Sequence, residues 1–356
     1  MSGKYYLVKN PYKSLPSSSF WSKSVSLRDT ALIDPIIETK FRFDKDMKIA
    51  SAGSCFAQQL SSRLKEIGIN YITKEPPHSL LNDSEAVLYN YNTYSARYGN
   101  IYTISQLKQL FQRAFNDSQY DSHILTSDNY FIDAYRPRIQ PKGFSSREEL
   151  ELDRKIHYKA VRSVFEELDV FIFTLGLTEA WRSKLDNTTF PICPLVFSES
   201  LRQEDYFLHN FSMDEIERNL EEFIDLLSVV NKSAKIILTV SPVPLVATGF
   251  KNHVLVSNCN SKSLLRVTAG NISEKYSNVD YFPSFEIVNT IPGYFSNDLR
   301  TVTQKGIDHV MKVFMNHYLL IGSNDNTNGQ PDENVKIDSY NNIFEEQCDE
   351  LIYQNK

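Results

Sequence analysis

Apolar and polar positions along residues 48–318 follow two different periods, which together predict alternating strands and helices. Short runs that are apolar at nearly every position predict buried strands at residues 48–52, 169–175, 235–240 and 279–282. Apolar residues spaced three and four apart predict helices at residues 55–68, 105–115, 146–168, 213–230, 262–276 and 303–318. Buried strands that alternate with helices are typical of a doubly wound parallel sheet covered on both faces. We therefore expect an α/β fold.

The two ends of the chain lack this pattern. Residues 1–45 are rich in Pro, Ser and aromatic residues, and we expect an extended N-terminal arm that packs on the core through Phe20 and Trp21. Residues 46–320 are predicted to form the α/β domain. Residues 321–356 begin with a stretch rich in Asn, Asp and Gly, which predicts a flexible tail.

Composition narrows the class of partner. The net charge of −6 argues against nucleic acid and against an anionic membrane surface, and favours a small-molecule or neutral polymer substrate. The four cysteines form no C-x-x-C pair, so the sequence predicts no metal site and no disulfide framework. The N-terminus does not resemble a signal peptide, and no apolar run approaches the roughly 20 residues of a membrane span, so we expect a cytoplasmic protein without membrane insertion. Composition leaves the oligomeric state open.

A serine lies at the sharp transition from the first predicted strand into its helix. Gly53 permits a tight turn, Ser54 follows it, and the first turn of the helix after Ser54 presents N–H groups without intrahelical partners. Such N–H groups suit a developing oxyanion, and hydrolases place nucleophiles at turns of this kind. The alternative is an ordinary strand–helix turn in which Ser54 is only the helix cap.

Polar residues also follow the later strands. Because ligands bind at the carboxyl edge of an open parallel sheet, we expect these residues to meet in one cleft. A nucleophile, an acid and small polar donors on neighbouring strand ends are the groups that acyl transfer requires. The candidates after Ser54 are Gly176, Thr178, Glu179, Ser241, Asp298 and Arg300.

Three blocks of the sequence resemble the GSCFA family. They are Gly53-Ser54-Cys55-Phe56-Ala57, residues 174–181 (TLGLTEAW) and residues 238–244 (LTVSPVP), and the resemblance extends over residues 10–320. That family is grouped with the SGNH or GDSL-like hydrolases. The resemblance implies a flavodoxin-like three-layer αβα sandwich and an ester hydrolase or acyltransferase with no cofactor, acting on an O-acylated carbohydrate or polysaccharide.

The family pattern also assigns roles. It implies that Ser54 is the nucleophile, although a strict alignment of Gly-Asp-Ser would place Cys55 there and make the protein a thiol enzyme. Gly53, Gly176 and Thr178 would belong to the oxyanion hole, with Thr178 at the position of an asparagine. Asn92 is the candidate for a second donor, and Asp298 for the acid.

The chain departs from the family pattern at its C-terminal block. Residues 298–301 read Asp-Leu-Arg-Thr, so Thr301 stands where the pattern has a basic histidine, and threonine does not accept a proton near neutral pH. We therefore expect either a base recruited from another loop, with His253 preferred over His209, or a catalytically silent member that binds a glycan or a protein.

Overall fold

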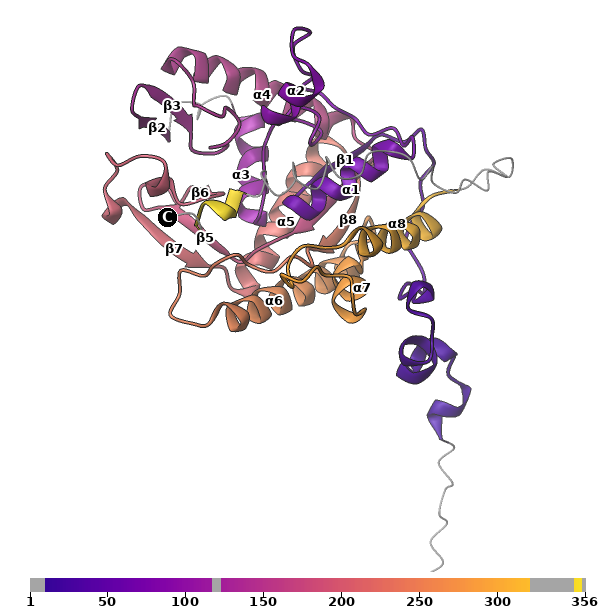
Figure 1. Ribbon diagram of the computed structural model, residues 1–356. Helices are drawn as coiled ribbons and strands as arrows, with labels where there is room; N and C mark the ends of the chain where they lie inside the picture. Colours follow the sequence, from indigo (N-terminus) through magenta and orange to yellow (C-terminus); the bar gives the residue numbers. More distant parts are fainter. Residues whose placement is uncertain (1–9, 117–122, 321–348, 354–356) are drawn as a thin grey trace, which may run out of the picture.

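A four-stranded parallel sheet forms the centre of the molecule (Figure 1). The computed structural model describes residues 10–116, 123–320 and 349–353. The strands lie in the order β1 (Ile49–Ala52), β4 (Val170–Leu175), β8 (Lys235–Val240) and β9 (Val279–Phe282). Tyr71 forms a parallel bridge with Ile49, on the side of β1 away from β4, in place of a further strand. This arrangement confirms the predicted doubly wound α/β fold.

Helices cover both faces of this sheet. One face packs against α3 (Ile104–Phe115), α4 (Arg147–Glu167), α5 (Met213–Val230) and α6 (Val254–Lys275). The other packs against α1 (Cys55–Glu66), α7 (Ser284–Thr290) and α8 (Gln304–Tyr318). Successive strand residues point to opposite faces, so Phe171 and Phe173 enter the first core while Val170 and Ile172 enter the second. This double burial explains why the strands are apolar at every position.

Most helices begin at the residue that the sequence indicates. Thr103 and Ser212 cap α3 and α5, each as part of a capping box, and Thr303 caps α8. Helix α6 is the exception, because it begins at Val254 rather than near Lys262. Its first turns carry exposed Leu255 and Val256, so they lack the amphipathic period by which a helix is predicted.

Antiparallel elements are inserted beside the sheet, and the sequence pattern did not predict them. Strand β2 (Ile124–Ser127) pairs with β3 (Tyr130–Asp133), and β5 (Glu179–Ser183) pairs with both β6 (Thr189–Phe190) and β7 (Tyr206–Asn210). Helix α2 (Asp83–Leu88) follows β1 and α1 along the chain. Short helical turns complete the described elements, at Pro11–Ser14, Ser17–Ser19, Ser22–Ser26, Thr30–Leu32, Pro194–Val196, Gln203–Asp205 and Asp349–Tyr353.

The N-terminal arm packs on the domain only in its later part. Trp21 is 68% exposed, so the prediction that this side chain packs on the core is wrong, and Figure 1 shows the preceding turns projecting from the domain. Contact begins at Val25, which packs against the second core, and continues through buried Ile33 to Phe43, whose N–H donates to the carbonyl of Tyr318 at 2.8 Å.

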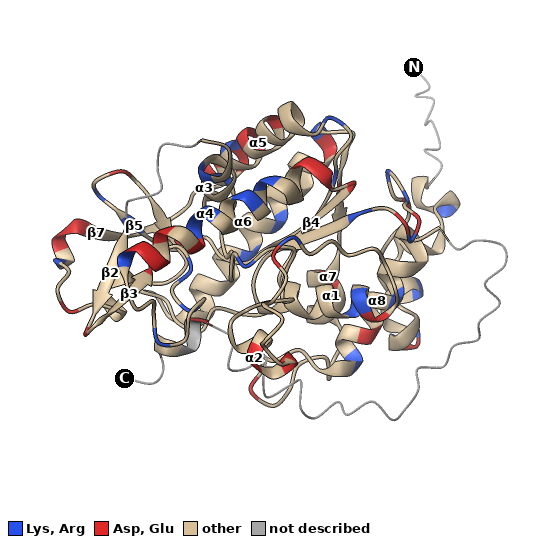
Figure 2. Cartoon of the chain, turned by 90° about the horizontal axis from the view of Figure 1, so that it is seen from above, with Lys and Arg blue, Asp and Glu red and all other residues tan. Residues whose placement is uncertain are grey.

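The predicted flexible tail lies largely outside the described residues. Within it, only Asp349–Tyr353 is described, as a short helix. Across the described part of the chain, no helix has the length and apolar character needed to cross a membrane. Figure 2 shows Lys and Arg interspersed with Asp and Glu along the helices, so neither sign of charge dominates the helices.

Candidate active site

The hydroxyl of Ser54 is the centre of the candidate site. Ser54 occupies the N-cap position of α1, yet its side chain makes no capping hydrogen bond. No described residue forms a hydrogen bond with its Oγ, although the residue is 95% buried, with a relative exposure of 5%. Ser54 therefore occupies the cap position without making the side-chain hydrogen bond by which a serine caps a helix.

Gly53 allows the turn that places Ser54 there. Its φ of +151° is unfavourable for residues with a side chain, and a Cβ at this position would lie 2.7 Å from the Cβ of Ala57 and 2.8 Å from that of Thr174. The turn is also held from the other side. The hydroxyl of Tyr94 lies 2.9 Å from the carbonyl oxygen of Gly53 and 2.8 Å from that of Ser54. The backbone at Ser54 is thus fixed by packing and by hydrogen bonds.

Gly176 faces Ser54 from the end of β4. A Cβ on Gly176 would lie 3.6 Å from Ser54 Oγ and 3.1 Å from the carbonyl oxygen of Tyr102. The N–H groups of Gly176 and Leu177 both donate to that Tyr102 carbonyl, at 3.1 and 2.9 Å. The carbonyl of Gly176 accepts a hydrogen bond from Nζ of buried Lys262 at 2.8 Å. Gly176 therefore provides space beside the serine, while its own backbone groups have partners within the fold.

The residues after the other strands lie at the same edge of the sheet. Ala52 of β1 pairs with Phe173 of β4, and Leu175 pairs with Val240 of β8, so Ser241 follows beside Gly176. The N–H of Ser241 donates to the carbonyl of Leu175 at 2.8 Å. The parallel register thus brings Ser54, Gly176 and Ser241 to one edge.

Thr178 and Glu179 follow Gly176 at the start of β5. Thr178 is buried, and its Oγ1 has no hydrogen-bond partner among the described residues, while its N–H donates to Oγ of Ser261 at 3.1 Å. Glu179 accepts from the hydroxyl of Thr248 at 2.8 Å, and burial raises the pKa of its carboxyl. Thr178 consequently keeps a free hydroxyl at this edge, whereas Glu179 is tied to Thr248.

The long aromatic segment before α3 contributes through residues that the sequence analysis did not single out. Asn92 is exposed, has a φ of +59°, and accepts a hydrogen bond from Lys65 through its carbonyl. Asn100 is instead the buried asparagine. Its Oδ1 accepts from Nε2 of Gln58 at 2.8 Å and lies 3.2 Å from the Tyr94 hydroxyl. A loop too long for a simple connection was the available signal, but it did not identify the residue.

Asp298 lies in an exposed loop and is bonded to that loop. Its carboxylate accepts from the N–H groups of Arg300 and Thr301, both at 2.9 Å, and from the Thr301 hydroxyl at 2.6 Å. Burial opposes ionisation, but these hydrogen bonds lower the pKa of Asp298. Thr301 thus orients the Asp298 carboxylate. It does not replace the histidine of the family pattern as a base.

No histidine forms a hydrogen bond with Ser54. All seven histidines of the chain are among the described residues, and none of them is a hydrogen-bond partner of Ser54. His253 is exposed at the N-cap of α6, where its Nδ1 accepts from the N–H of Leu255 at 3.2 Å. His209 pairs with Glu215 at 2.9 Å, and buried His309 pairs with Tyr294 at 2.7 Å. Among the described residues, neither Asp298 nor a histidine therefore forms a hydrogen bond with Ser54, and their roles as acid and base stay predictions.

Cys55 begins α1 directly after Ser54. Its side chain is half-buried. Among the described residues, no group of three His, Cys, Asp or Glu side chains is arranged to hold a metal ion.

Comparison with known proteins gives the class. The model of the GSCFA family matches residues 48–314, which include the turn at Ser54 and all four strands of the sheet. The chain is therefore an α/β protein with a serine at the β1–α1 turn, and it belongs to the GSCFA family.

Similarity to solved structures is weaker, and no curated protein matches the chain. A carbohydrate esterase family 3 protein from Talaromyces cellulolyticus has 7% identity and a TM-score of 0.34, with 75% of this chain and 94% of that one covered. A family 3 carbohydrate esterase from Clostridium thermocellum has 11% identity and a TM-score of 0.32, with 77% and 95% covered.

Proposed function

We propose that this protein is an SGNH-like ester hydrolase or acyltransferase that acts on an O-acylated substrate, with a carbohydrate as the acyl carrier. The observation that carries this proposal is the hydroxyl of Ser54. It lies at the β1–α1 turn, it is not used as a helix cap, and Gly176 leaves room beside it. A serine held in this way fits a nucleophile better than a structural cap.

The proposed reaction has two steps. Ser54 Oγ attacks the acyl carbonyl and forms a new C–O bond, the ester C–O bond breaks, and the departing alcohol carries away the serine proton. Water, or the hydroxyl of an acceptor, then attacks the acyl-serine and regenerates Ser54 with transfer of a proton back to Oγ. The N–H groups in the first turn of α1, which a helix leaves without intrahelical acceptors, and the hydroxyl of Thr178 are the candidates for stabilising the oxyanion.

The lack of an imidazole partner favours a second candidate, a catalytically silent member that binds a glycan or a protein at the same edge. Removal of one member of a catalytic triad leaves roughly 10³- to 10⁴-fold catalysis over water. The enzyme proposal therefore predicts slow turnover, whereas the binding proposal predicts none.

Four proteins separate these candidates. Labelling by a fluorophosphonate probe and hydrolysis of 4-nitrophenyl acetate would be measured for the natural chain, Ser54→Ala, Cys55→Ala and Thr301→His. We expect slow labelling of the natural chain, none for Ser54→Ala, and near-natural labelling for the neighbouring control Cys55→Ala. Thr301→His would raise turnover by up to about 10² to 10⁴, the usual contribution of a general base.

Each other outcome has a distinct meaning. If the natural chain is inert and Thr301→His creates labelling, the protein is a silent relative. If Cys55→Ala loses labelling and Ser54→Ala keeps it, the thiol is the nucleophile.

We also propose that the protein works in the cytoplasm. Cys193 and Cys259 are thiols outside any disulfide, which fits a reducing compartment. Fractionation of cells that express the tagged full chain would test this, and recovery outside the cytosolic fraction would contradict it.

A further inference from the structure

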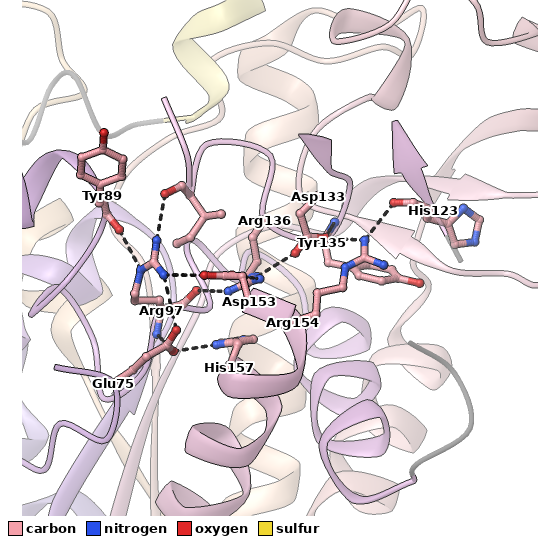
Figure 3. Close-up of polar contacts among 11 residues, drawn as sticks. Glu75, Tyr89, Arg97, His123, Asp133, Tyr135, Arg136, Asp153, Arg154 and His157 are labelled. Carbon is pink, nitrogen blue, oxygen red and sulfur yellow. Dashed lines mark hydrogen bonds and ion pairs between the residues drawn. The ribbon is translucent and has the colours of Figure 1, made fainter. Parts of the chain in front are cut away.

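A network of buried charged side chains lies at α4 (Figure 3). Arg97 and Arg136 share the carboxylate of Asp153, at 2.9 and 2.6 Å. Asp133 is fully buried between Arg136 at 2.8 Å and Arg154 at 2.7 Å. Burial opposes ionisation of Asp133, but the two guanidinium groups hold the pKa of its carboxyl well below its usual range. Removal of so many charges from water is costly, which raises the question of what the network supports.

The network contains a carboxylate–imidazole pair. Glu75 Oε2 lies 2.8 Å from Nδ1 of His157, and both side chains are buried. Burial alone would raise the pKa of Glu75, but His157, Arg136 and the N–H of Arg97 lower it to about 2. Burial lowers the pKa of His157. Near neutral pH, Nδ1 therefore carries the proton that is donated to Glu75, and Nε2 presents its lone pair.

Two small cavities meet at this network. The inner one has a volume of about 20 Å³, is lined by Arg113, Arg136 and His157, and lies against α3 and α4. The outer one, of about 10 Å³, is lined by Arg136, Arg138 and Asp349. Tyr98, Asn100, Tyr135, Arg136 and Pro191 line both cavities, so the two lie side by side, and we call them together the hollow. Such volumes hold one or two oxygen-sized groups.

Two buried polar atoms at the inner cavity have no partner in the described part of the chain. They are Nε of Arg113 and Nε2 of His157, on side chains that are more than nine-tenths buried. The guanidinium of Arg113 lies over the ring of Tyr135, 3.9 Å from its centroid, and forms no ion pair with a described carboxylate. One atom is a charged donor and the other an acceptor. The two atoms call for an acceptor at Arg113 and a donor at His157, and a ligand with an anionic acceptor beside a hydroxyl satisfies both.

The charge of the network favours the anion. Among the described residues of the network and of the hollow, five guanidinium groups stand beside four carboxylates, which is one positive charge more while His157 is neutral. The guanidinium groups belong to Arg97, Arg113, Arg136, Arg138 and Arg154, and the carboxylates to Glu75, Asp133, Asp153 and Asp349.

A carboxylate of the chain itself already occupies the mouth of the hollow. Asp349, in the short helix near the C-terminus, accepts from Nδ2 of Asn100 at 2.9 Å and lies 3.8 Å from Nε of Arg138. Asn100 also contacts Tyr94, whose hydroxyl contacts the carbonyl of Ser54. The mouth thus accepts a carboxylate, and it is connected to the nucleophile turn through two side chains.

We propose that this hollow is a subsite for a ligand that carries a carboxylate next to a hydroxyl, as a sugar acid does, and that Asp349 occupies its mouth in the absence of this ligand. The ligand carboxylate accepts from Arg113, and its neighbouring hydroxyl donates to His157. The inference deepens the proposed function, on which it rests, because a sugar acid bound here would belong to the substrate whose ester reaches Ser54.

Binding to the full chain can be measured by calorimetry with three probes at constant ionic strength. D-glucuronate carries both groups, D-glucose lacks the carboxylate, and acetate lacks the hydroxyl. We expect glucuronate to bind at least tenfold more tightly than either. Arg113→Gln should weaken glucuronate binding about 10- to 100-fold, the range expected for loss of a charged hydrogen bond. Asp349→Asn should tighten it several-fold, because a competing carboxylate is removed.

Two controls separate this subsite from folding and from catalysis. Arg162→Gln removes another guanidinium that lies over a ring, that of Phe115 at 5.3 Å, but Arg162 does not line the hollow, so binding should be unchanged. Ser54→Ala should also bind normally. If Ser54→Ala binds glucuronate but is not labelled by the fluorophosphonate probe, the subsite and the nucleophile are tested independently.

Two results would overturn the subsite. One is equal glucuronate affinity in Arg113→Gln and the natural chain. The other is glucuronate binding no tighter than that of glucose in both the natural chain and Asp349→Asn, a result that does not depend on whether Arg113→Gln folds.

Discussion

Gly176 and Ser54 face one another across the edge of the sheet, so closely that a Cβ on Gly176 would lie 3.6 Å from Ser54 Oγ. This distance is an ordinary van der Waals contact, but the same Cβ would be only 3.1 Å from the Tyr102 carbonyl. The space beside the serine therefore exists because position 176 has no side chain. An acyl carbonyl that approaches Oγ would need this space.

Gly176→Ala should accordingly impair acylation more than folding. The methyl group requires a shift of a few tenths of an ångström at Tyr102, so we expect a stability loss of about 1 kcal/mol and a tenfold or greater fall in the rate of fluorophosphonate labelling. Thermal unfolding and labelling would be measured together. Gly270→Ala is the control, because its Cβ would meet only the flexible end of Arg266 in α6. Labelling of Gly176→Ala at the natural rate would mean that the acyl group does not use this space.

Gly53→Ala should destabilise the fold by about 2 kcal/mol or more, through overpacking against Ala57 and Thr174 at a φ of +151°. Gly68→Ala is the matched control, because Gly68 also has a positive φ, +76°, but a Cβ there would meet open space. We expect it to cost only about 1 kcal/mol, the penalty of the left-handed backbone. Urea unfolding of both variants would measure the difference, and equal losses would show that contact with β4 does not govern the turn.

His253→Ala should leave esterase turnover unchanged. The sequence analysis preferred His253 as the base, but the structure places it at the exposed N-cap of α6, where it accepts the N–H of Leu255. We expect loss of this cap to cost about 1 kcal/mol or less in the free energy of unfolding. A fall in turnover of 10² or more, with the stability unchanged, would instead return His253 to the role of base through movement of its loop.

The sequence predicted the sheet better than it predicted the site. Strands such as Lys235–Val240 are buried on both faces, so they appear as uninterrupted apolar runs, and one turn residue, Gly53, fixes where Ser54 falls. The antiparallel strands around Glu179–Ser183 were missed because they are half-buried and are stabilised by pairing with distant segments.

Side-chain partners depend on contacts that are remote in the sequence. Asn92 and Asn100 lie in the same polar, aromatic segment, and only the fold shows that Asn100 is the buried one. The network at Glu75 joins residues 82 positions apart in the pair with His157, and no local period indicates such a pair. For the same reason, the absence of an imidazole at Ser54 could not be established from the C-terminal block alone.

The ionised Glu75 and the neutral His157 beside it make the free energy of unfolding depend on pH. The pKa of Glu75 is about 2 in the folded chain and 4.5 ordinarily, so its contribution is present above pH 4.5 and is lost as pH falls toward 2. The pKa of His157 is lowered by burial, so the unfolded chain takes up a proton first as pH falls below about 6.5, which destabilises the fold in the same direction.

Glu75→Gln should therefore lower the free energy of unfolding on the order of 3 kcal/mol at pH 7, the value that corresponds to a carboxyl pKa reduced from 4.5 to about 2. The gap between the natural chain and the variant should narrow as pH falls from 4.5 to 2, because the natural carboxylate is then protonated as well. Urea unfolding from pH 7 to pH 2 would measure it. Glu151→Gln is the control, since Glu151 forms only a surface ion pair with Arg147 and should change stability by less than about 0.5 kcal/mol at any pH. A gap that stays constant across this range would mean that Glu75 contributes through packing and not through its charge.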